Sequence, residues 1–250
     1  MPRRQPRNIQ SMELPIRWLV TDERQGPALL SSIRALPAGS AILFRHYKTP
    51  APERRRLFKA VRNLAESHHH LLILSDTAVT ARRWGADGVH LTARNKGRVN
   101  VARYARQAGL LVTMTAHDED EMKVARRLAD IILVAPVYPT ATHPHAATLG
   151  DDGFAALAAK TAKPIIALGG MTPERFAKLE NKGADGWAAI DGLTKNEPIP
   201  PQQAASKNEI FQIFRSELAC RHKPLGCRCA RRSAASGGHL LSCSAHPPSP

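Results

Sequence analysis

Polar side chains whose types suit phosphate binding recur at the ends of short apolar runs in this sequence. They are Arg45, Thr115, His117, Thr140, Thr142, His143 and the pair Gly169-Gly170, and the carboxylate Asp76 ends another of these runs. Basic groups and hydroxyls hydrogen-bond phosphate oxygens, and glycine lets backbone N–H groups come close to an anion. If the ends of these runs meet in the fold, the sequence predicts that they form a single phosphate-binding opening, the mouth of the fold.

The runs that carry these residues have the pattern of buried parallel strands. They are nearly continuous in apolar residues and do not alternate between apolar and polar, as expected for strands covered on both faces. The eight predicted strands are Ile16–Thr21, Ala41–Arg45, Leu71–Asp76, Gly88–Leu91, Leu111–Thr115, Ile131–Ala135, Pro164–Leu168 and Gly186–Ile190.

Segments with helical spacing lie between the strands. The predicted helices are Glu53–Ser67, Ala78–Trp84, Asn100–Ala108, Glu119–Leu128, Phe154–Lys160 and the segment from Pro173 to Glu180, which Thr172 caps. Alternating strands and helices predict a single (β/α)8 barrel, with a doubly wound open sheet as the alternative. In such a barrel the active site lies at the carboxyl ends of the strands.

The barrel is predicted over residues 13–196, and the flanking segments have another composition. Residues 1–12 are basic and are expected to be disordered. Residues 197–219 are predicted to be a proline-rich linker followed by a terminal helix. The segment 220–250 holds all four cysteines and is expected to be a disordered tail with free thiols.

The formal net charge is +15, and the two ends of the chain carry more than half of it, because residues 1–12 contribute +3 and residues 206–250 contribute +5. A basic body favours anionic ligands. Nucleic acid is not expected, since only 5% of the residues are aromatic and no binding motif is present. No apolar run is long enough for a membrane helix, and the expected compartment is the cytoplasm.

Several of these residues also have a purely structural interpretation. Gly169-Gly170 suits a tight turn, Asp76 suits a helix cap, and His117 suits a packed loop. The triplets His68–His70 and Arg54–Arg56 are interpreted as structural histidines and as a solvated helix face, respectively.

Six motifs in order resemble the family of thiamine phosphate synthase and the TenI-type thiazole tautomerase, over roughly residues 14–195. The motifs are Leu19–Asp22, Gly85–Leu91, Thr115–His117, Pro136–Thr142, Ala167–Met171 and Gly183–Gly186. The resemblance implies a transferase that joins a hydroxymethylpyrimidine pyrophosphate to a thiazole phosphate and releases pyrophosphate.

The resemblance also implies roles for individual residues. Arg45 and Thr115 would hold the pyrimidine pyrophosphate, and Asp76 and Asn95 would hold Mg2+. The thiazole phosphate would lie against a set of residues near the ends of the last strands, namely Thr140, Thr142, His143, Gly169 and Gly170. The expected partners are small phosphorylated heterocycles, in a protein that could form a homo-oligomer.

The chain departs from the family pattern at charged positions. Tyr47 and His143 stand where the family has lysines, and Asn95 stands where it has a second carboxylate. An amide contributes no charge to a metal, so a lower Mg2+ affinity is expected. His46, Arg94 and His143 are candidates for compensating phosphate contacts.

Two alternatives to the synthase follow from these departures. One is a TenI-type thiazole tautomerase, an isomerase in which His117 would act as acid and base. The other is a barrel that binds a phosphorylated ligand without catalysis.

Overall fold

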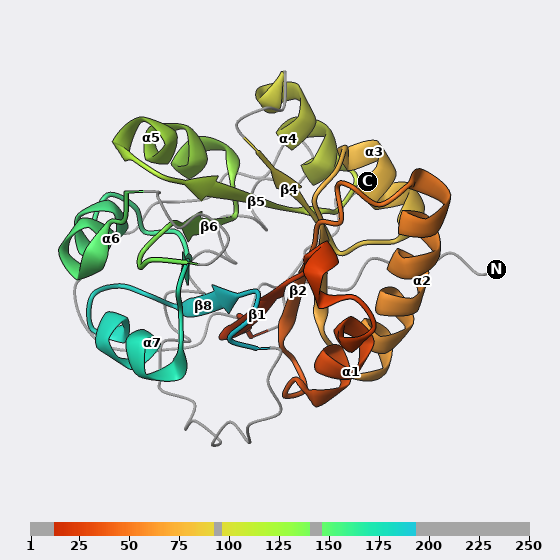
Figure 1. The fold of residues 1–250 in the computed structure, drawn as a ribbon. Coiled ribbons are helices and arrows are strands. Elements are labelled where there is room, and N and C mark those ends of the chain that lie inside the picture. Colours follow the sequence, from red (N-terminus) through yellow and green to blue (C-terminus); the bar gives the residue numbers. More distant parts are fainter. Residues whose placement is uncertain (1–12, 93–96, 141–146, 194–250) are drawn as a thin grey trace, which may run out of the picture. The chain divides into compact units, whose positions relative to one another are not determined.

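The computed structural model describes residues 13–92, 97–140 and 147–193, and these form a closed barrel of eight parallel strands. Each strand pairs with the next along the chain, and β1 pairs with β8 to close the ring. The helices lie around the outside of the strands (Figure 1). The prediction of a (β/α)8 barrel is confirmed.

The observed elements lie close to the predicted ones. The strands are β1 (Arg17–Val20), β2 (Ala41–Phe44), β3 (Leu71–Leu74), β4 (Gly88–Leu91), β5 (Leu111–Ala116), β6 (Ile131–Val134), β7 (Ile165–Leu168) and β8 (Gly186–Ala189). The helices are α1 (Ala28–Ala35), α2 (Ala51–Ser67), α3 (Ala78–Trp84), α4 (Arg98–Gln107), α5 (Glu119–Leu128), α6 (Gly150–Ala158) and α7 (Pro173–Glu180), with a short 3-10 turn at Glu23–Gln25.

Helix α1 was not predicted, because its sequence carries turn-forming residues. Gly26-Pro27 precedes it, and two serines lie in its middle. Both serine hydroxyls donate to the carbonyl oxygen of Ala28, at 2.8 Å from Ser31 and 2.9 Å from Ser32. Serines usually favour turns by bonding to the nearby backbone, but here they do so inside a helix.

Side chains alternate between two hydrophobic layers along each strand. Residues such as Trp18, Leu43 and Leu133 form the cluster inside the barrel, whereas Leu19 and Phe44 pack outward against the helices. The same alternation places polar side chains inside the barrel near its mouth, since their strand neighbours belong to the outer layer.

Three aspartates tie neighbouring strands together at the amino-terminal face. Each precedes an even-numbered strand, and its carboxylate accepts a bond from the backbone of the strand before it. Asp87 accepts from Leu72 N at 2.9 Å, Asp130 from Val112 N at 2.8 Å, and Asp185 from Ile165 N at 2.9 Å. The Gly-Ala-Asp-Gly motifs of the sequence therefore support the barrel at the face opposite the mouth.

Three arginines make a second set of ties at this face. Arg62 of α2 donates to Trp84 O at 3.1 Å, Arg82 of α3 donates to Ala108 O at 2.8 Å, and Arg106 of α4 donates to Leu128 O at 2.6 Å. Each guanidinium thus caps carbonyl groups at the carboxyl end of the following helix, where a positive charge is favourable.

The predicted tails and terminal helix, at 1–12, 197–219 and 220–250, lie outside the described residues. None of the helices within the described ranges is long and apolar enough to cross a membrane.

Replacement of Asp87 by alanine tests the aspartate ties. The change leaves the buried N–H of Leu72 without this acceptor, which costs about 1–3 kcal/mol of unfolding free energy. Urea unfolding of Asp87→Ala measures the loss, with Asp120→Ala as the control, because the Asp120 side chain is 90% exposed. An equal, small effect of both substitutions would contradict the structural role of Asp87.

Candidate active site

The predicted site residues that the structure describes all lie at the carboxyl ends of the strands. Arg45 follows β2, Asp76 follows β3, Thr115 lies in β5 and His117 follows it. Thr140 follows β6 and Gly169-Gly170 follow β7. Asn95, Thr142 and His143 lie outside the described residues, so their assigned roles stay predictions.

A pocket of about 150 Å3 opens between the ends of β6, β7 and β8. It is lined by Pro139, Thr140, Leu168, Gly169, Gly170, Met171, Ala189, Ile190, Asp191 and Gly192. The structure therefore brings together Thr140 and the glycine pair, which the family resemblance assigns to one phosphate subsite. Their contact with a ligand stays a prediction.

The glycine pair adopts backbone conformations that other residues rarely adopt. Its φ angles are +100° at Gly169 and +61° at Gly170. A Cβ atom on Gly170 would lie 2.4 Å from the carbonyl oxygen of Pro139, and one on Gly169 would lie 2.9 Å from Pro136 Cα. The tight-turn interpretation is therefore correct, and the same turn lets the β7 loop pack directly on the β6 loop.

Arg175 and Tyr138 hold these two loops from outside the pocket. The Arg175 guanidinium donates to the carbonyl oxygen of Gly170 and lies 4.7 Å from the centre of the Tyr138 ring. The Tyr138 hydroxyl donates to Asp151 at 2.6 Å. Burial and this carboxylate raise the pKa of Tyr138 to about 12, so the phenol remains a donor.

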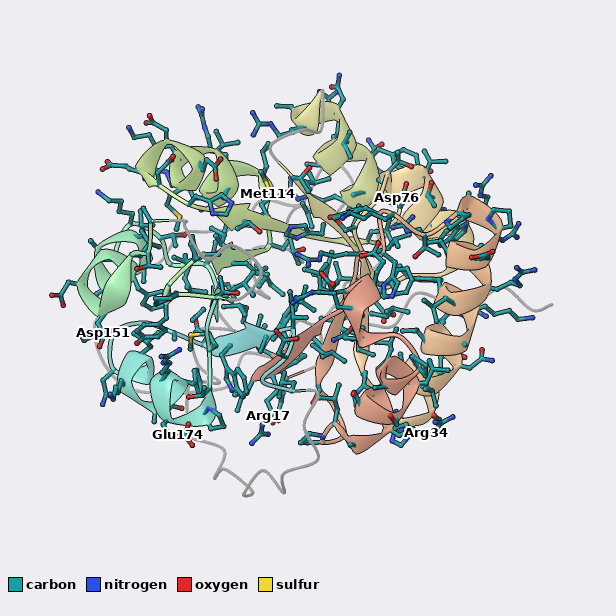
Figure 2. The ribbon with its side chains drawn as sticks, viewed as in Figure 1. Arg17, Arg34, Asp76, Met114, Asp151 and Glu174 are labelled. Carbon is teal, nitrogen blue, oxygen red and sulfur yellow. The ribbon has the colours of Figure 1, made fainter. Side chains whose placement is uncertain are left out.

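This arrangement cannot be predicted from the sequence. Arg175 follows a helix cap and resembles any surface arginine, and only the fold brings α7 to the Tyr138 ring. Figure 2 shows Asp151 at α6 and Glu174 at α7, on the side of the barrel that carries the pocket loops.

A buried histidine lies inside the barrel next to Thr115. His90 Nδ1 is 2.8 Å from the Thr113 hydroxyl, and His90 Nε2 is 3.3 Å from the Thr115 hydroxyl. Burial, together with the nearby Arg45 guanidinium, lowers the pKa of His90 to about 4. The imidazole is therefore neutral near pH 7, with one donor and one acceptor nitrogen for the two threonines.

Arg45 is held by the end of β1. Its Nη2 atom lies 3.1 Å from Asp22 Oδ2, and its Nε atom donates to Thr21 O at 3.3 Å. Burial raises the pKa of Asp22, but hydrogen bonds from Arg24 and the charges of Arg24 and Arg45 outweigh it and lower the pKa. Asp22 is thus ionised, and the charge of Arg45 is compensated by a carboxylate beside it.

His46 does not reach the mouth as a phosphate contact. It is buried, its ring stacks on Phe44 with centroids 4.9 Å apart, and Nδ1 lies 2.9 Å from the Thr21 hydroxyl. The same hydroxyl oxygen accepts from Arg45 N at 3.0 Å, so Thr21 links the His46 ring to the backbone that follows β2. The prediction that His46 compensates for a lost lysine is wrong, because burial favours a neutral ring packed on the core.

Tyr47 forms a contact of its own at the lysine position of the family pattern. Its hydroxyl lies 2.5 Å from the buried Ser75 hydroxyl. The bond joins the ends of β2 and β3 without adding charge to the mouth.

Asp76 is paired with a cation of the protein. Its Oδ2 atom lies 2.5 Å from Arg54 Nη1, and its Oδ1 atom accepts from Thr77 N at 2.6 Å. Thr77, and not Asp76, is the side-chain cap of α3. Figure 2 shows Asp76 beside α2 and α3. Arg54 itself is buried, so the prediction of a solvated face holds for Arg55 and Arg56 only.

The described residues do not fit a resident divalent metal. Both Asp76 oxygens are engaged, and no group of three His, Cys, Asp or Glu side chains converges within the described ranges. Asn95, the other predicted ligand, lies outside them. The Mg2+ expectation therefore stays a prediction.

His117 is fixed in one tautomer. Its Nδ1 atom donates to Ala135 O at 2.5 Å, and its backbone N–H donates to Glu121 at 3.0 Å. Since a carbonyl only accepts, Nδ1 carries a proton and Nε2 holds the lone pair of the neutral ring. This is the nitrogen that acid–base chemistry at His117 would use.

The fold and the site define a (β/α)8 barrel with polar groups at the strand ends and a glycine-lined pocket between the ends of the last three strands. A family model described as thiamine monophosphate synthase matches residues 18–193, which span nearly the whole barrel. The chain belongs to the thiamine monophosphate synthase family.

Individual relatives agree with this family. The thiamine-phosphate synthase of Chlorobium luteolum is 32% identical over 211 residues, covering 83% of this chain and 98% of the relative. That of Chromobacterium violaceum is 34% identical over 162 residues, covering 64% and 77%. The thiamine phosphate pyrophosphorylase structure from Pyrococcus furiosus has a TM-score of 0.63 at 23% identity, covering 83% and 96%, and supports the fold.

The neutral state of His90 makes stability depend on pH. Below pH 6.5 the unfolded chain binds a proton at His90, whereas the folded chain does not. The contribution of neutral His90 to the free energy of unfolding is therefore lost as the pH falls toward 4. The loss is at most about 1.4 kcal/mol per pH unit. We expect the stability difference between wild type and His90→Asn, measured by urea unfolding, to shrink from pH 7 to pH 4.5. A difference that is constant with pH would contradict a buried neutral His90.

The close approach of the two loops at Gly170 is tested by comparing alanine substitutions at Gly170 and at Gly39, a glycine with a similar positive φ but no neighbouring atoms around an added Cβ. Gly39 has φ +78° and no atom within 4 Å of an added Cβ, whereas Gly170 has φ +61° and a clash with Pro139. We expect Gly170→Ala to be about 1–3 kcal/mol less stable than Gly39→Ala, since overpacking adds to the common backbone strain. Thermal unfolding measures both; equal losses would show that the close approach of the two loops is unimportant.

Proposed function

We propose that this chain is a thiamine phosphate synthase, a transferase that couples a hydroxymethylpyrimidine pyrophosphate to a thiazole phosphate in thiamine biosynthesis. The observation that carries the proposal is the pocket of Thr140, Gly169 and Gly170, which lies inside the part of the chain matched by the family model. The named relatives are synthases and support the same reaction.

The thiazole phosphate binds in this pocket. Gly169 and Gly170 allow an anion to approach the backbone, and Thr140 brings a hydroxyl to the lining of the same pocket. Arg175 and Tyr138 keep the two loops in register, since the first bonds Gly170 and the second anchors to α6. The phosphate thereby fixes the thiazole ring above the barrel.

The pyrimidine pyrophosphate binds across the mouth, near β2 and β5. Arg45 faces its negative charge, and the Thr115 hydroxyl provides a hydrogen bond whose direction is set by His90. His90 stays neutral and is therefore a positioning residue, which aligns Thr115 without adding a charge.

In the reaction the carbon–oxygen bond between the pyrimidine methylene and pyrophosphate breaks, and its electron pair leaves with the pyrophosphate. The thiazole nitrogen then forms a bond to the methylene carbon. Groups that bind the departing anion lower the barrier because negative charge develops there. Arg45, which follows β2, provides a positive charge for the departing pyrophosphate.

The tautomerase alternative rests on His117, whose Nε2 holds the lone pair that proton transfer would need. The named relatives favour the synthase, so we keep the synthase as the proposal. We also propose that the substrates are small phosphorylated heterocycles and that the reaction takes place in the cytoplasm, as expected for a biosynthetic enzyme; a homo-oligomer remains a prediction.

The function is tested by measuring thiamine phosphate formation from the two substrates, with Thr115 varied. Thr115→Val keeps the side-chain shape but removes the hydroxyl, and we expect kcat/KM to fall by about tenfold or more, the worth of one hydrogen bond to a charged group. Thr115→Ser keeps the hydroxyl and should stay within a few-fold of wild type. Equal activity of the valine variant would refute the role of Thr115, and a folded wild type without product would refute the synthase.

A further inference from the structure

Arg54 is anchored inside the protein although it lies in a run of three arginines. Its side chain is 10% exposed. The Nε atom donates to Arg45 O at 2.9 Å, Nη2 donates to Ser75 O at 3.0 Å, and Nη1 pairs with Asp76. The guanidinium thus ties α2 to the residues that end β2 and β3.

Aromatic rings hold the same guanidinium in place. Its central carbon lies 5.6 Å from the centre of the Phe44 ring and 5.5 Å from that of Trp84. A positive charge over aromatic faces is favourable, most of all where water is excluded. The Arg54–Asp76 pair therefore differs from an exposed ion pair, because its cation is already ordered before any ligand binds.

The Asp76 carboxylate has both oxygens engaged by the protein, as one faces Arg54 and the other accepts from the Thr77 backbone. It is still 25% exposed at the mouth. A divalent cation that approached it would have to displace the guanidinium or lie beside its positive charge. Either course weakens metal binding, since like charges repel and the freed Arg54 would be a buried unpaired cation.

We propose that Arg54 excludes divalent cations from Asp76, so that the cation at this carboxylate is a fixed side chain of the protein. The inference rests on the proposed function, because the family resemblance is what makes Asp76 a metal ligand. It assigns Arg54 as a positioning residue that acts on metal binding through Asp76. The cations described at this side of the mouth, Arg45 and Arg54, then each face one carboxylate.

The test measures the binding of Mn2+ alone to the full chain. Electron paramagnetic resonance gives the concentration of free Mn2+ and hence the affinity. We compare wild type, Arg54→Gln, Arg54→Lys and the double variant Arg54→Gln/Asp76→Asn. Removal of the guanidinium charge should raise the Mn2+ affinity by about tenfold or more, since the carboxylate charge is then uncompensated. The double variant should lose this gain, and the lysine variant should keep the low affinity of wild type.

A merely structural role of Arg54 predicts another pattern, in which melting temperature falls but Mn2+ affinity does not change. An unchanged affinity in folded Arg54→Gln would therefore overturn the proposal. A gain that persists in the double variant would also overturn it, because the metal would then bind elsewhere.

Arg54→Gln could fail to fold because the side chain is buried, so Asp76→Asn alone provides a second measurement. An asparagine oxygen can still accept from Arg54, and we expect its Mn2+ affinity to equal that of wild type. A lower affinity in Asp76→Asn would overturn the proposal, since Asp76 would then be ligating metal in the presence of Arg54. These experiments use no substrate. Their result can therefore be interpreted even if the synthase assay gives no product.

Discussion

The alternation of side chains along short, fully buried strands controls the position of each polar group in the mouth. In a closed parallel barrel, a strand side chain points either toward the barrel axis or toward the surrounding helices. Successive side chains along a strand alternate between these two directions. Val89 and Met114 point outward, so His90 and Thr115 point inward and meet. The apolar residues that alternate with them along β4 and β5 are therefore as necessary to the contact as the polar ones.

The same constraint explains how much of the structure could be predicted from sequence. The eight strands and the placement of Thr140 and Gly169-Gly170 at one mouth follow from local pattern and from the rule that barrel sites lie at carboxyl ends. The contacts of Arg54, His46 and Arg175 do not follow from the local pattern, because each residue contacts a partner that is distant in sequence. Arg54 looks solvated until Asp76, Phe44 and Trp84 surround it.

Electrostatics at the mouth is more balanced than the composition indicates. His46 and His90 have pKa values lowered by burial, so neither adds a positive charge near pH 7. Arg45 and Arg54 each face a carboxylate. A phosphorylated ligand would therefore meet pre-oriented hydrogen-bond donors and compensated cations, an environment that favours orientation over simple charge attraction.

The arginines at the opposite face give the barrel a mechanical property. Arg62, Arg82 and Arg106 each donate a hydrogen bond from one helix to the carboxyl end of the next. Helices α2, α3, α4 and α5, each with its strand, are thereby linked in series as structural units. If one unit opened, its neighbour would lose a cap and become easier to open as well. Part of the high arginine content thus couples the opening of adjacent units and makes this half of the barrel behave as one cooperative block.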